Sequence, residues 1–222
     1  MTWAGAGGGA PADLVRAARA AGVGDRRVLE ALGRVRREGF VPEGFRDTAY
    51  EDRPVPIANG QVTTQPSLVG RMVAALRLRG GERVLEVGTG LGYQAAVLAA
   101  LLPAGHVWTL ERFADLAGQA RANLAAAGAG NVTVVVGDGT LGWPERAPYQ
   151  AIVVAAAAPR VPAPLAEQLA EGGRLVQPLG PGGDELVTLL RKRDGRLREE
   201  GVVVPAYFVR LVGTHGLPEE PA

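Results

Sequence analysis

The spacing of apolar positions changes near residue 82, and the two spacings predict different kinds of structure. Before that residue, apolar side chains recur at intervals of about three to four positions, which is typical of helices with one buried face. After it, short runs of consecutive apolar residues alternate with longer segments of helical spacing. Short buried strands that alternate with helices are typical of an open, mainly parallel α/β sheet.

The first part of the chain predicts three helices joined by irregular segments. Pro11 is suited to open the first helix, and Asp25 is suited to cap a second helix that runs to about Arg37. Pro66 is suited to open a third helix. Between the second and third helices, residues 40–56 contain too many prolines to form regular structure throughout.

The second part predicts parallel strands with helices between them, followed by a hairpin. The strands are expected at residues 83–87, 106–110, 132–136, 150–154 and 173–178. The helices are expected near residues 92–102, 113–127 and 162–171. Two apolar runs then flank Asp194-Gly195, a dipeptide that favours a tight hairpin turn. We therefore expect an α/β fold with a doubly wound, mainly parallel, seven-stranded Rossmann-like sheet that ends in antiparallel strands.

A glycine-rich turn follows the first of these strands. Strand, glycine turn and helix together form the ligand site of many open α/β sheets. A dinucleotide-binding turn would place a glycine where this chain has Tyr93, so the spacing favours a ligand with an adenosine but no pyrophosphate. S-adenosylmethionine fits that description. The turn supplies the candidate cofactor-binding residues Gly88, Thr89, Gly90 and Gly92.

Three carboxylates lie at the ends of consecutive predicted strands, namely Glu86, Glu111 and Asp138. Glu111 lies about 20 residues past the turn, where an acid can accept hydrogen bonds from both ribose hydroxyls. Asp138 is suited to bond an adenine amino group, and Gly139 leaves a backbone N–H open to a ring nitrogen. Simpler alternatives are a solvated strand end for Glu86, a helix N-terminal charge for Glu111 and a Gly-Asp-Gly turn for Asp138. Their occurrence on consecutive strands favours the cofactor site.

Composition narrows the possible chemistry. The 222-residue chain has no cysteine and two histidines, which excludes thiolate zinc sites and a thiol nucleophile and argues against a metal site. Its net charge of +1 gives no overall field to attract nucleic acid or an anionic membrane. No apolar run is long enough to cross a bilayer and no signal-peptide pattern is present, so a cytoplasmic location is expected.

The segment before the first sheet strand is the most specific part of the chain. Residues 50–66 resemble the corresponding segment of protein-L-isoaspartate (D-aspartate) O-methyltransferases. The resemblance covers roughly residues 12–213. Its other matching motifs lie at residues 35–42, 85–94, 137–139, 147–154 and 169–176.

This resemblance implies a class I methyltransferase that uses S-adenosylmethionine and releases S-adenosyl-L-homocysteine. Its acceptor would be the free carboxylate of L-isoaspartyl residues, and of some D-aspartyl residues, in damaged proteins. The methyl ester then closes to a succinimide that reopens partly to normal aspartate. A carboxylate with a pKa of about 4 is already ionised at neutral pH, so alignment can replace a strong general base.

The resemblance also implies roles for particular residues. Thr64 stands where many family members have serine, and as the catalytic residue its hydroxyl would orient the attacking carboxylate. The alternative for Thr64 is an N-cap of the helix that opens near Pro66. The implied substrate-binding residues are Ile57, Ala58, Val62, Thr63 and Val212.

The chain departs from the usual family pattern at Ala58-Asn59, at residues 155–159 and at Arg210, where proline is common. Two alternatives stay open beside isoaspartyl repair: a class I methyltransferase for RNA or a small molecule, and a cofactor-binding protein without enzymatic activity. We expect a monomer that binds isoaspartyl peptides and proteins but neither nucleic acid nor membranes. The expected parts are a disordered N-terminus (1–10), a helical and substrate-loop extension (11–80), a methyltransferase domain (81–213) and a tail (214–222).

Overall fold

Seven strands form one sheet in the order β5-β4-β3-β6-β7-β8-β9 in the computed structural model, which describes residues 9–180 and 183–219. The expected disorder of residues 1–8 therefore lies outside the described residues, as does the end of the tail. The strands are β3 (Arg83–Val87), β4 (His106–Glu111), β5 (Val132–Val136), β6 (Tyr149–Val154), β7 (Leu169–Leu179), β8 (Glu185–Arg193) and β9 (Arg196–Ala206).

The pairing of these strands confirms the expected fold class. The neighbours from β5 across to β7 are parallel, and β8 and β9 are added antiparallel. The hairpin between β8 and β9 turns at Asp194 and Gly195, which both have positive φ. A turn with two positive φ values suits the right-handed twist of the strands it connects.

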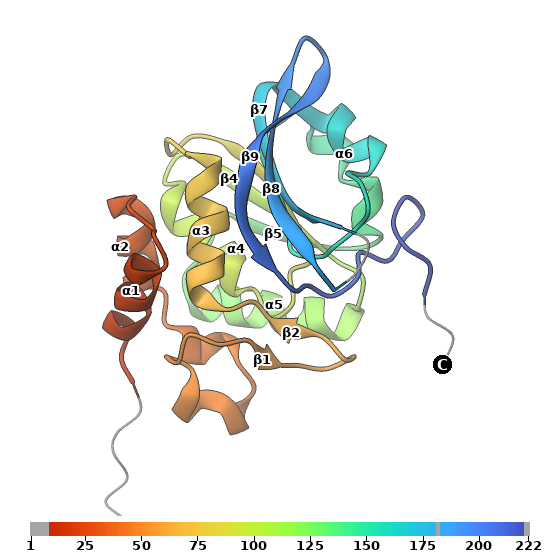
Figure 1. Cartoon of the computed structure of the whole chain (residues 1–222). Coiled ribbons are helices and arrows are strands. Elements are labelled where there is room, and N and C mark those ends of the chain that lie inside the picture. Colours follow the sequence, from red (N-terminus) through yellow and green to blue (C-terminus); the bar gives the residue numbers. More distant parts are fainter. Residues whose placement is uncertain (1–8, 181–182, 220–222) are drawn as a thin grey trace, which may run out of the picture.

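Helices cover both faces of the sheet, and an N-terminal helical layer lies against α3 and α4 at one side (Figure 1). The α-helices are α1 (Pro11–Ala20), α2 (Arg26–Arg34), α3 (Pro66–Leu76), α4 (Tyr93–Leu101), α5 (Ala114–Ala126) and α6 (Ala163–Gln168). The 3-10 helices are η1 (Arg37–Phe40), η2 (Glu43–Thr48), η3 (Gly139–Leu141) and η4 (Pro144–Arg146). A separate two-stranded sheet consists of β1 (Val55–Pro56) and β2 (Val62–Thr63).

Two helix ends differ from the prediction. Asp25 caps α2 as expected, since it accepts the N–H of Arg27 at 2.9 Å, but the helix stops at Arg34 instead of Arg37. The chain changes direction after Arg34, and the next helix, η1, begins at Arg37, whose side chain is buried in the interior. The helix expected to reach residue 171 ends at Gln168, because Leu169 pairs with Tyr149 at the start of β7. Sheet pairing overrides local helix propensity at that point.

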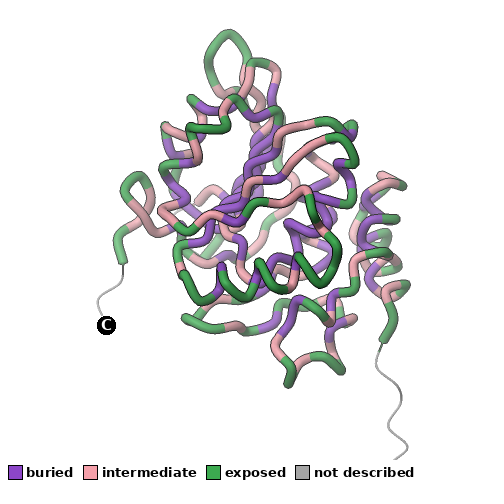
Figure 2. The backbone as a smooth tube through the Cα atoms, turned by 180° about the vertical axis from the view of Figure 1, so that it is seen from behind, coloured by how far each residue is buried: buried purple, intermediate pink, exposed green. Residues whose placement is uncertain are grey.

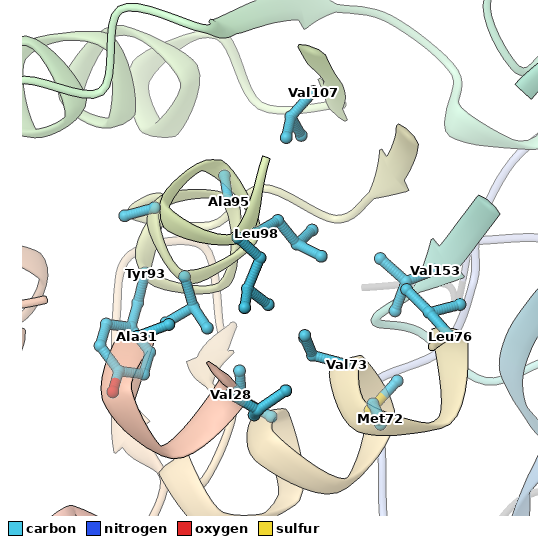
Figure 3. Close-up of a cluster of buried hydrophobic side chains, with 14 of the residues drawn as sticks. Val28, Ala31, Met72, Val73, Leu76, Tyr93, Ala95, Leu98, Val107 and Val153 are labelled. Atoms are coloured by element: carbon cyan, nitrogen blue, oxygen red, sulfur yellow. The ribbon is translucent and has the colours of Figure 1, made fainter. Parts of the chain in front are cut away.

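The central strands are buried on both faces, and the buried backbone runs through the middle of the molecule (Figure 2). Successive side chains of a strand point to opposite faces, so Ile152 and Val154 pack on one face and Val153 on the other. The face covered by α2, α3 and α4 is shown in Figure 3. It brings together Val28, Ala31, Met72, Val73, Leu76, Tyr93, Ala95, Leu98, Val107 and Val153.

The connections of β3 determine where a ligand can bind. The chain winds from β3 outward to β4 and β5, then returns to β6 on the other side of β3. Such a reversal leaves a crevice beyond the carboxyl ends of the strands. None of the helices in the described parts of the chain has the length and hydrophobicity needed to cross a membrane.

The buried face of β6 provides a test of this packing. Ile152 is fully buried, so Ile152→Ala should lower the free energy of unfolding by about 2–5 kcal/mol through lost contacts and a cavity. Val202 on β9 is 48% exposed, and Val202→Ala should cost about 0.5 kcal/mol or less. Chemical denaturation of both variants measures the difference, and equal losses would contradict the assigned burial.

Candidate active site

A cavity lies at the carboxyl ends of β3, β4 and β6, where the strand order reverses. Residues 57–64 and 209–212, which come from outside these strands, close it. It is lined by these residues singled out from the sequence: Ile57, Val62, Thr63, Thr64, Gly88, Thr89, Gly90, Glu111, Gly139 and Val212. The remaining candidates, which do not line it, are Ala58, Glu86, Gly92 and Asp138.

The glycine turn forms the floor of the cavity. Gly88 and Gly90 have φ values of +93° and +54°, which favour glycine, and both line the cavity. Gly92 also has positive φ, but a Cβ there would lie 3.2 Å from Leu124 Cγ on α5. A side chain there would press on α5, and Gly92 does not line the cavity, so its expected contact with the cofactor stays a prediction.

Glu111 joins the turn to the neighbouring strand. Its Oε2 accepts the N–H of Gly90 at 2.8 Å, and its Oε1 accepts the N–H of Phe113 at 3.1 Å. Burial raises the pKa of Glu111, and the backbone N–H groups of Phe113 and Gly90 partly oppose that rise. Each carboxylate oxygen accepts more than one hydrogen bond, so the side chain keeps acceptor capacity toward the cavity that it lines.

Glu86 lies behind the wall of the cavity instead of in it, which corrects its expected contact with the ligand. The side chain is fully buried and accepts hydrogen bonds from Gln94 Nε2 at 3.0 Å and Thr109 Oγ1 at 2.5 Å. Strand alternation turns it toward the face that α4 covers. Its effect on the cavity is indirect, since Gln94 and Thr89, which pairs with Thr109, both line the cavity.

Asp138 bonds to the C-terminal segment, and its expected contact with adenine stays a prediction. Its carboxylate accepts the N–H of Thr140 at 2.8 Å and the N–H of Thr214 at 2.7 Å. Burial acts to raise the pKa of Asp138, but a hydrogen bond from the Thr140 hydroxyl at 2.6 Å and the two backbone N–H groups hold it below its ordinary value. Gly139 does line the cavity, and a Cβ there would lie 2.3 Å from Val87 Cγ1, so only glycine fits.

Residues 57–64 form the wall opposite the glycine turn. Ala58 lies at the exposed tip of the β1–β2 hairpin and does not reach the cavity. Thr63 lines the cavity, but its hydroxyl accepts hydrogen bonds from Arg37 Nη2 at 3.0 Å and from the Val55 N–H at 3.2 Å. Thr64 does not cap α3: the N-cap is Gln65, which makes no side-chain cap.

A second cavity lies on the other side of Thr64, with a volume of about 710 Å³. Its shared wall with the first cavity consists of Val62, Thr64, Ala155, Val209 and Arg210. The remaining lining includes Leu68 and the highly exposed Tyr207. Among the described lining residues the charged side chains are arginines, and none is a carboxylate. Thr64 thus lies between the first cavity, called the crevice below, and this second cavity, called the groove below.

Other lining residues were not singled out from the sequence, including Gln61, Gln94, Arg112 and Ala156. Gln94 and Arg112 lie close to the glycine turn and to Glu111 in the chain, a signal that could have identified them. Gln94 Oε1 is buried and has no hydrogen-bond partner among the described residues. Because buried acceptors are normally paired, a ligand donor would satisfy it.

The lining fits S-adenosylmethionine. Gly88, Gly90 and Gly139 allow a ligand to approach the backbone, and Glu111 and Gln94 offer acceptors for hydroxyl and amino groups. No group of three or more histidine, aspartate or glutamate side chains that could hold a metal ion occurs in the described parts of the chain. A reversed α/β sheet with this glycine cradle and an acid on the next strand has the class I methyltransferase fold.

Comparison with known proteins identifies the family. The profile of the protein-L-isoaspartate (D-aspartate) O-methyltransferase family matches residues 10–216. A protein-L-isoaspartate O-methyltransferase of Aeropyrum pernix is 51% identical over 201 residues, covering 89% of this chain and 77% of that protein. One of Methanoculleus marisnigri is 50% identical over 198 residues, covering 89% of each. The chain belongs to the protein-L-isoaspartate (D-aspartate) O-methyltransferase family.

Solved structures agree with this assignment. A protein-L-isoaspartate O-methyltransferase structure matches with a TM-score of 0.84 and 29% identity, covering 93% of this chain and 67% of the other. A Plasmodium falciparum structure given the same family name contains S-adenosyl-L-homocysteine. It matches with a TM-score of 0.79 and 23% identity, covers 92% of this chain and 99% of the other, and supports the fold.

Glu86 generates a prediction on pH-dependent stability. Burial raises its pKa from 4.5 to about 7, so the folded state keeps this proton to higher pH than the unfolded chain does. The carboxyl group therefore costs stability increasingly as pH rises from about 4.5 to above 7, reaching about 3 kcal/mol. Glu86→Gln removes this cost, and its Tm relative to wild type should rise by about 5 °C or more between pH 5 and pH 8.

Thermal unfolding at both pH values measures this effect. Glu167→Gln on α6 is the matched control, because that side chain is exposed. A Tm difference between Glu86→Gln and wild type that stays constant from pH 5 to pH 8 would show that Glu86 is ionised in the folded protein throughout.

Proposed function

We propose that this protein transfers a methyl group from S-adenosylmethionine to the free carboxylate of L-isoaspartyl residues in damaged proteins. The observation that carries the proposal is the position of Thr64, which lines both the crevice and the adjoining groove. A methyltransferase needs a cofactor and an acceptor that meet at one point. Family membership supplies the identity of the acceptor.

The crevice provides the proposed cofactor contacts. The backbone at Gly88, Thr89 and Gly90 lies along the ligand, and Glu111 accepts hydrogen bonds from the ribose hydroxyls. Gly139 exposes backbone toward adenine, and Gln94 Oε1 accepts a hydrogen bond from the amino group of the methionine part. When bound, S-adenosylmethionine supplies a methyl group on a sulfonium, which an ionised carboxylate can take without a strong base.

The protein's contribution to the reaction is alignment and exclusion of water. The Thr64 hydroxyl donates a hydrogen bond to the acceptor carboxylate and orients it without removing a proton. Ile57, Val62, Val212 and Ala155 supply apolar atoms around it. In such surroundings the carboxylate loses part of its hydration, which makes it a better nucleophile.

The groove would hold the peptide on both sides of the isoaspartyl residue. Its exposed apolar groups include Val62, which is 44% exposed, and Tyr207, which is 79% exposed. Exposed apolar surface next to a reaction centre favours a peptide ligand. D-aspartyl acceptors, a monomeric state, a cytoplasmic location and the lack of nucleic-acid partners stay predictions.

Labelled S-adenosylmethionine and paired peptides test the proposed function. A peptide with L-isoaspartate should acquire base-labile methyl esters, and the same peptide with L-aspartate should not. Binding of S-adenosyl-L-homocysteine, measured by calorimetry, shows that the protein sample is folded and able to bind the cofactor product. Equal labelling of both peptides, or none by a competent sample, would refute isoaspartyl repair.

Thr64 is the first residue to test. Thr64→Val should lower kcat/KM by about 10- to 100-fold, because a hydrogen bond to a charged group is lost. The Kd of S-adenosyl-L-homocysteine should stay nearly constant, since the cofactor contacts lie across the cavity. Thr133→Val, at an exposed position of β5, is the control for the substitution itself. Unchanged turnover in Thr64→Val would show that the Thr64 hydroxyl does not orient the acceptor carboxylate.

Arg210 is expected to influence the choice of peptide. It lines both cavities at the position where the family commonly has proline. Because one exposed ion pair contributes about 0.2–1 kcal/mol, Arg210→Gln should raise KM for isoaspartyl peptides with acidic flanks by about 1.5- to 5-fold. KM for peptides with basic flanks should not rise, and added salt should shrink the difference. Arg196→Gln, at the far end of β9, should change neither.

A further inference from the structure

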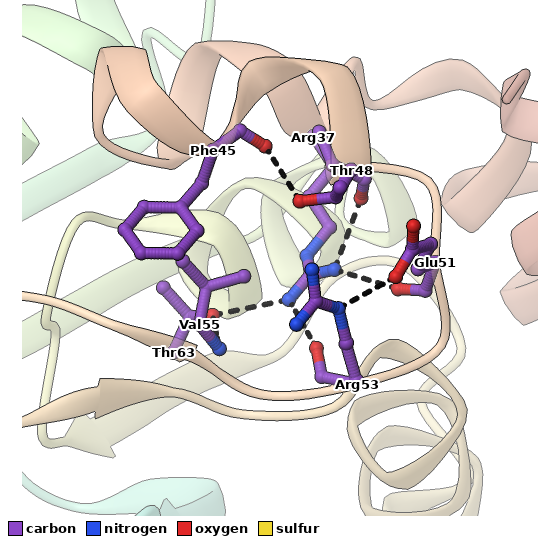
Figure 4. Close-up of polar contacts among 8 residues, drawn as sticks. Arg37, Phe45, Thr48, Glu51, Arg53, Val55 and Thr63 are labelled. Carbon is purple, nitrogen blue, oxygen red and sulfur yellow. Dashed lines mark hydrogen bonds and ion pairs between the residues drawn. The ribbon is translucent and has the colours of Figure 1, made fainter. Parts of the chain in front are cut away.

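Arg37 is a fully buried arginine that the reaction described above does not use. It lies at the first position of η1, beneath the segment formed by residues 49–64 (Figure 4). Its guanidinium donates to the carbonyl oxygens of Ala49, Glu51 and Arg53 at 3.0, 3.0 and 2.9 Å. It also donates to Thr63 Oγ1 at 3.0 Å. One side chain therefore holds four points of the segment.

The surroundings of this charge are unusual. None of its hydrogen-bond acceptors is a carboxylate, and its Nε has no partner among the described residues. Burial lowers the pKa of Arg37, while the nearby Tyr93 and Asp52 act to raise it. A buried charge without a paired ion is costly. Its presence therefore points to a geometric requirement that a neutral side chain would not meet.

Arg37 contacts both walls of the active site. On one side it holds Thr63, the residue before Thr64. On the other side its guanidinium carbon lies 5.6 Å from the ring centroid of Tyr93, which begins α4 directly after the glycine turn and lines the cavity. Arg37 therefore packs between the residue that precedes Thr64 and the residue that follows the glycine turn, so it influences the distance between these two walls.

A second set of contacts fixes the chain beyond Thr64. Asp52, within the segment that Arg37 holds, accepts the N–H of Ser67 at 2.8 Å and a hydrogen bond from Gln65 Nε2 at 2.7 Å. The chain directly after Thr64 is therefore tied to Asp52, while Thr63, directly before it, is tied to Arg37. Residues 49, 51 and 53 are in turn tied to Arg37 by their backbone carbonyls, so Arg37 also supports the position of Asp52.

We propose that Arg37 is a positioning residue for methyl transfer. Acting through Thr63 and residues 49–53, it holds Thr64 at the distance from the glycine turn at which the acceptor carboxylate is aligned. This inference rests on the proposed function of the site. The planar, five-donor guanidinium is needed because lysine offers a single point charge and does not reach carbonyls in several directions at once.

Steady-state kinetics of Arg37→Lys and Arg37→Met with an isoaspartyl peptide test the proposal. Both variants should lose about tenfold or more in kcat/KM, because misplacement by about 1 Å costs on the order of 100-fold. The Kd of S-adenosyl-L-homocysteine should change little. Leu32→Ala is the control, because it removes packing from the buried face of α2, outside residues 49–64. The two variants are compared where they have lost similar Tm relative to wild type. If Arg37→Lys then loses no more kcat/KM than Leu32→Ala, the proposal is overturned.

Thr63 keeps the proposal testable if the Arg37 variants fold poorly. Thr63→Ser retains the hydroxyl that accepts from Arg37, so it should lose much less kcat/KM than Thr63→Val, which removes that hydroxyl. In a double-mutant cycle, Thr63→Val should cost much less in the Arg37→Lys background than in wild type. Additive losses, or equal activity of Thr63→Ser and Thr63→Val, would show that Arg37 does not act through Thr63.

Amide hydrogen exchange distinguishes failure of this proposal from failure of the proposed function. Arg37→Lys should raise exchange at the amides of Val55 and Ile57, which are bonded within the held segment, and leave β3 and β6 protected. That result would support the anchoring role even if no isoaspartyl peptide were methylated. Uniformly raised exchange across the sheet would refute a local positioning role.

Discussion

The reversal of strand order at β3 is the constraint on which the site depends. Because β4 and β6 flank β3 and all three are parallel, their carboxyl ends open together on one crevice. The chain leaves β3 through a turn in which Gly88, Gly90 and Gly92 have positive φ. Glu111 at the end of β4 accepts the N–H of Gly90, so the neighbouring strand holds the turn in place.

The sheet supplies one wall of the active site, and segments far away in the sequence supply the rest. Residues 57–64 and 209–212 close the crevice, and Thr64 divides it from the groove. Neither segment belongs to the strands that form the crevice, so their placement depends on contacts made elsewhere. For the first segment those contacts converge on Arg37. For the second, Ala157 donates to the carbonyl of Val209 at 2.8 Å and accepts the N–H of Leu211 at 2.7 Å, and Asp138 holds Thr214 farther along. One buried side chain thus holds the first segment, and a short backbone pairing holds the second.

Sequence reasoning located the site better than it assigned the side chains. Glu86, Glu111 and Asp138 all lie at strand ends as expected, yet only Glu111 faces the cavity. A motif identifies the end of a strand, but a shift by one residue along the strand turns a side chain to the opposite face. Gly92 shows a related limit of the pattern: its positive φ is visible in the glycine spacing, while its proximity to Leu124 arises only when α5 packs.

The local pattern by itself determined the order and type of most elements, the glycine turn and the family. Helical and strand spacing, proline at helix starts and Asp194-Gly195 at the hairpin act over a few residues, so they can be recognised without the fold. Only the tertiary structure decided that α2 stops at Arg34 and that Arg37 enters the core. It also decided that Thr64 stands between two cavities. Burial and hydrogen bonding between distant segments control these features, and a linear pattern does not record which segments meet.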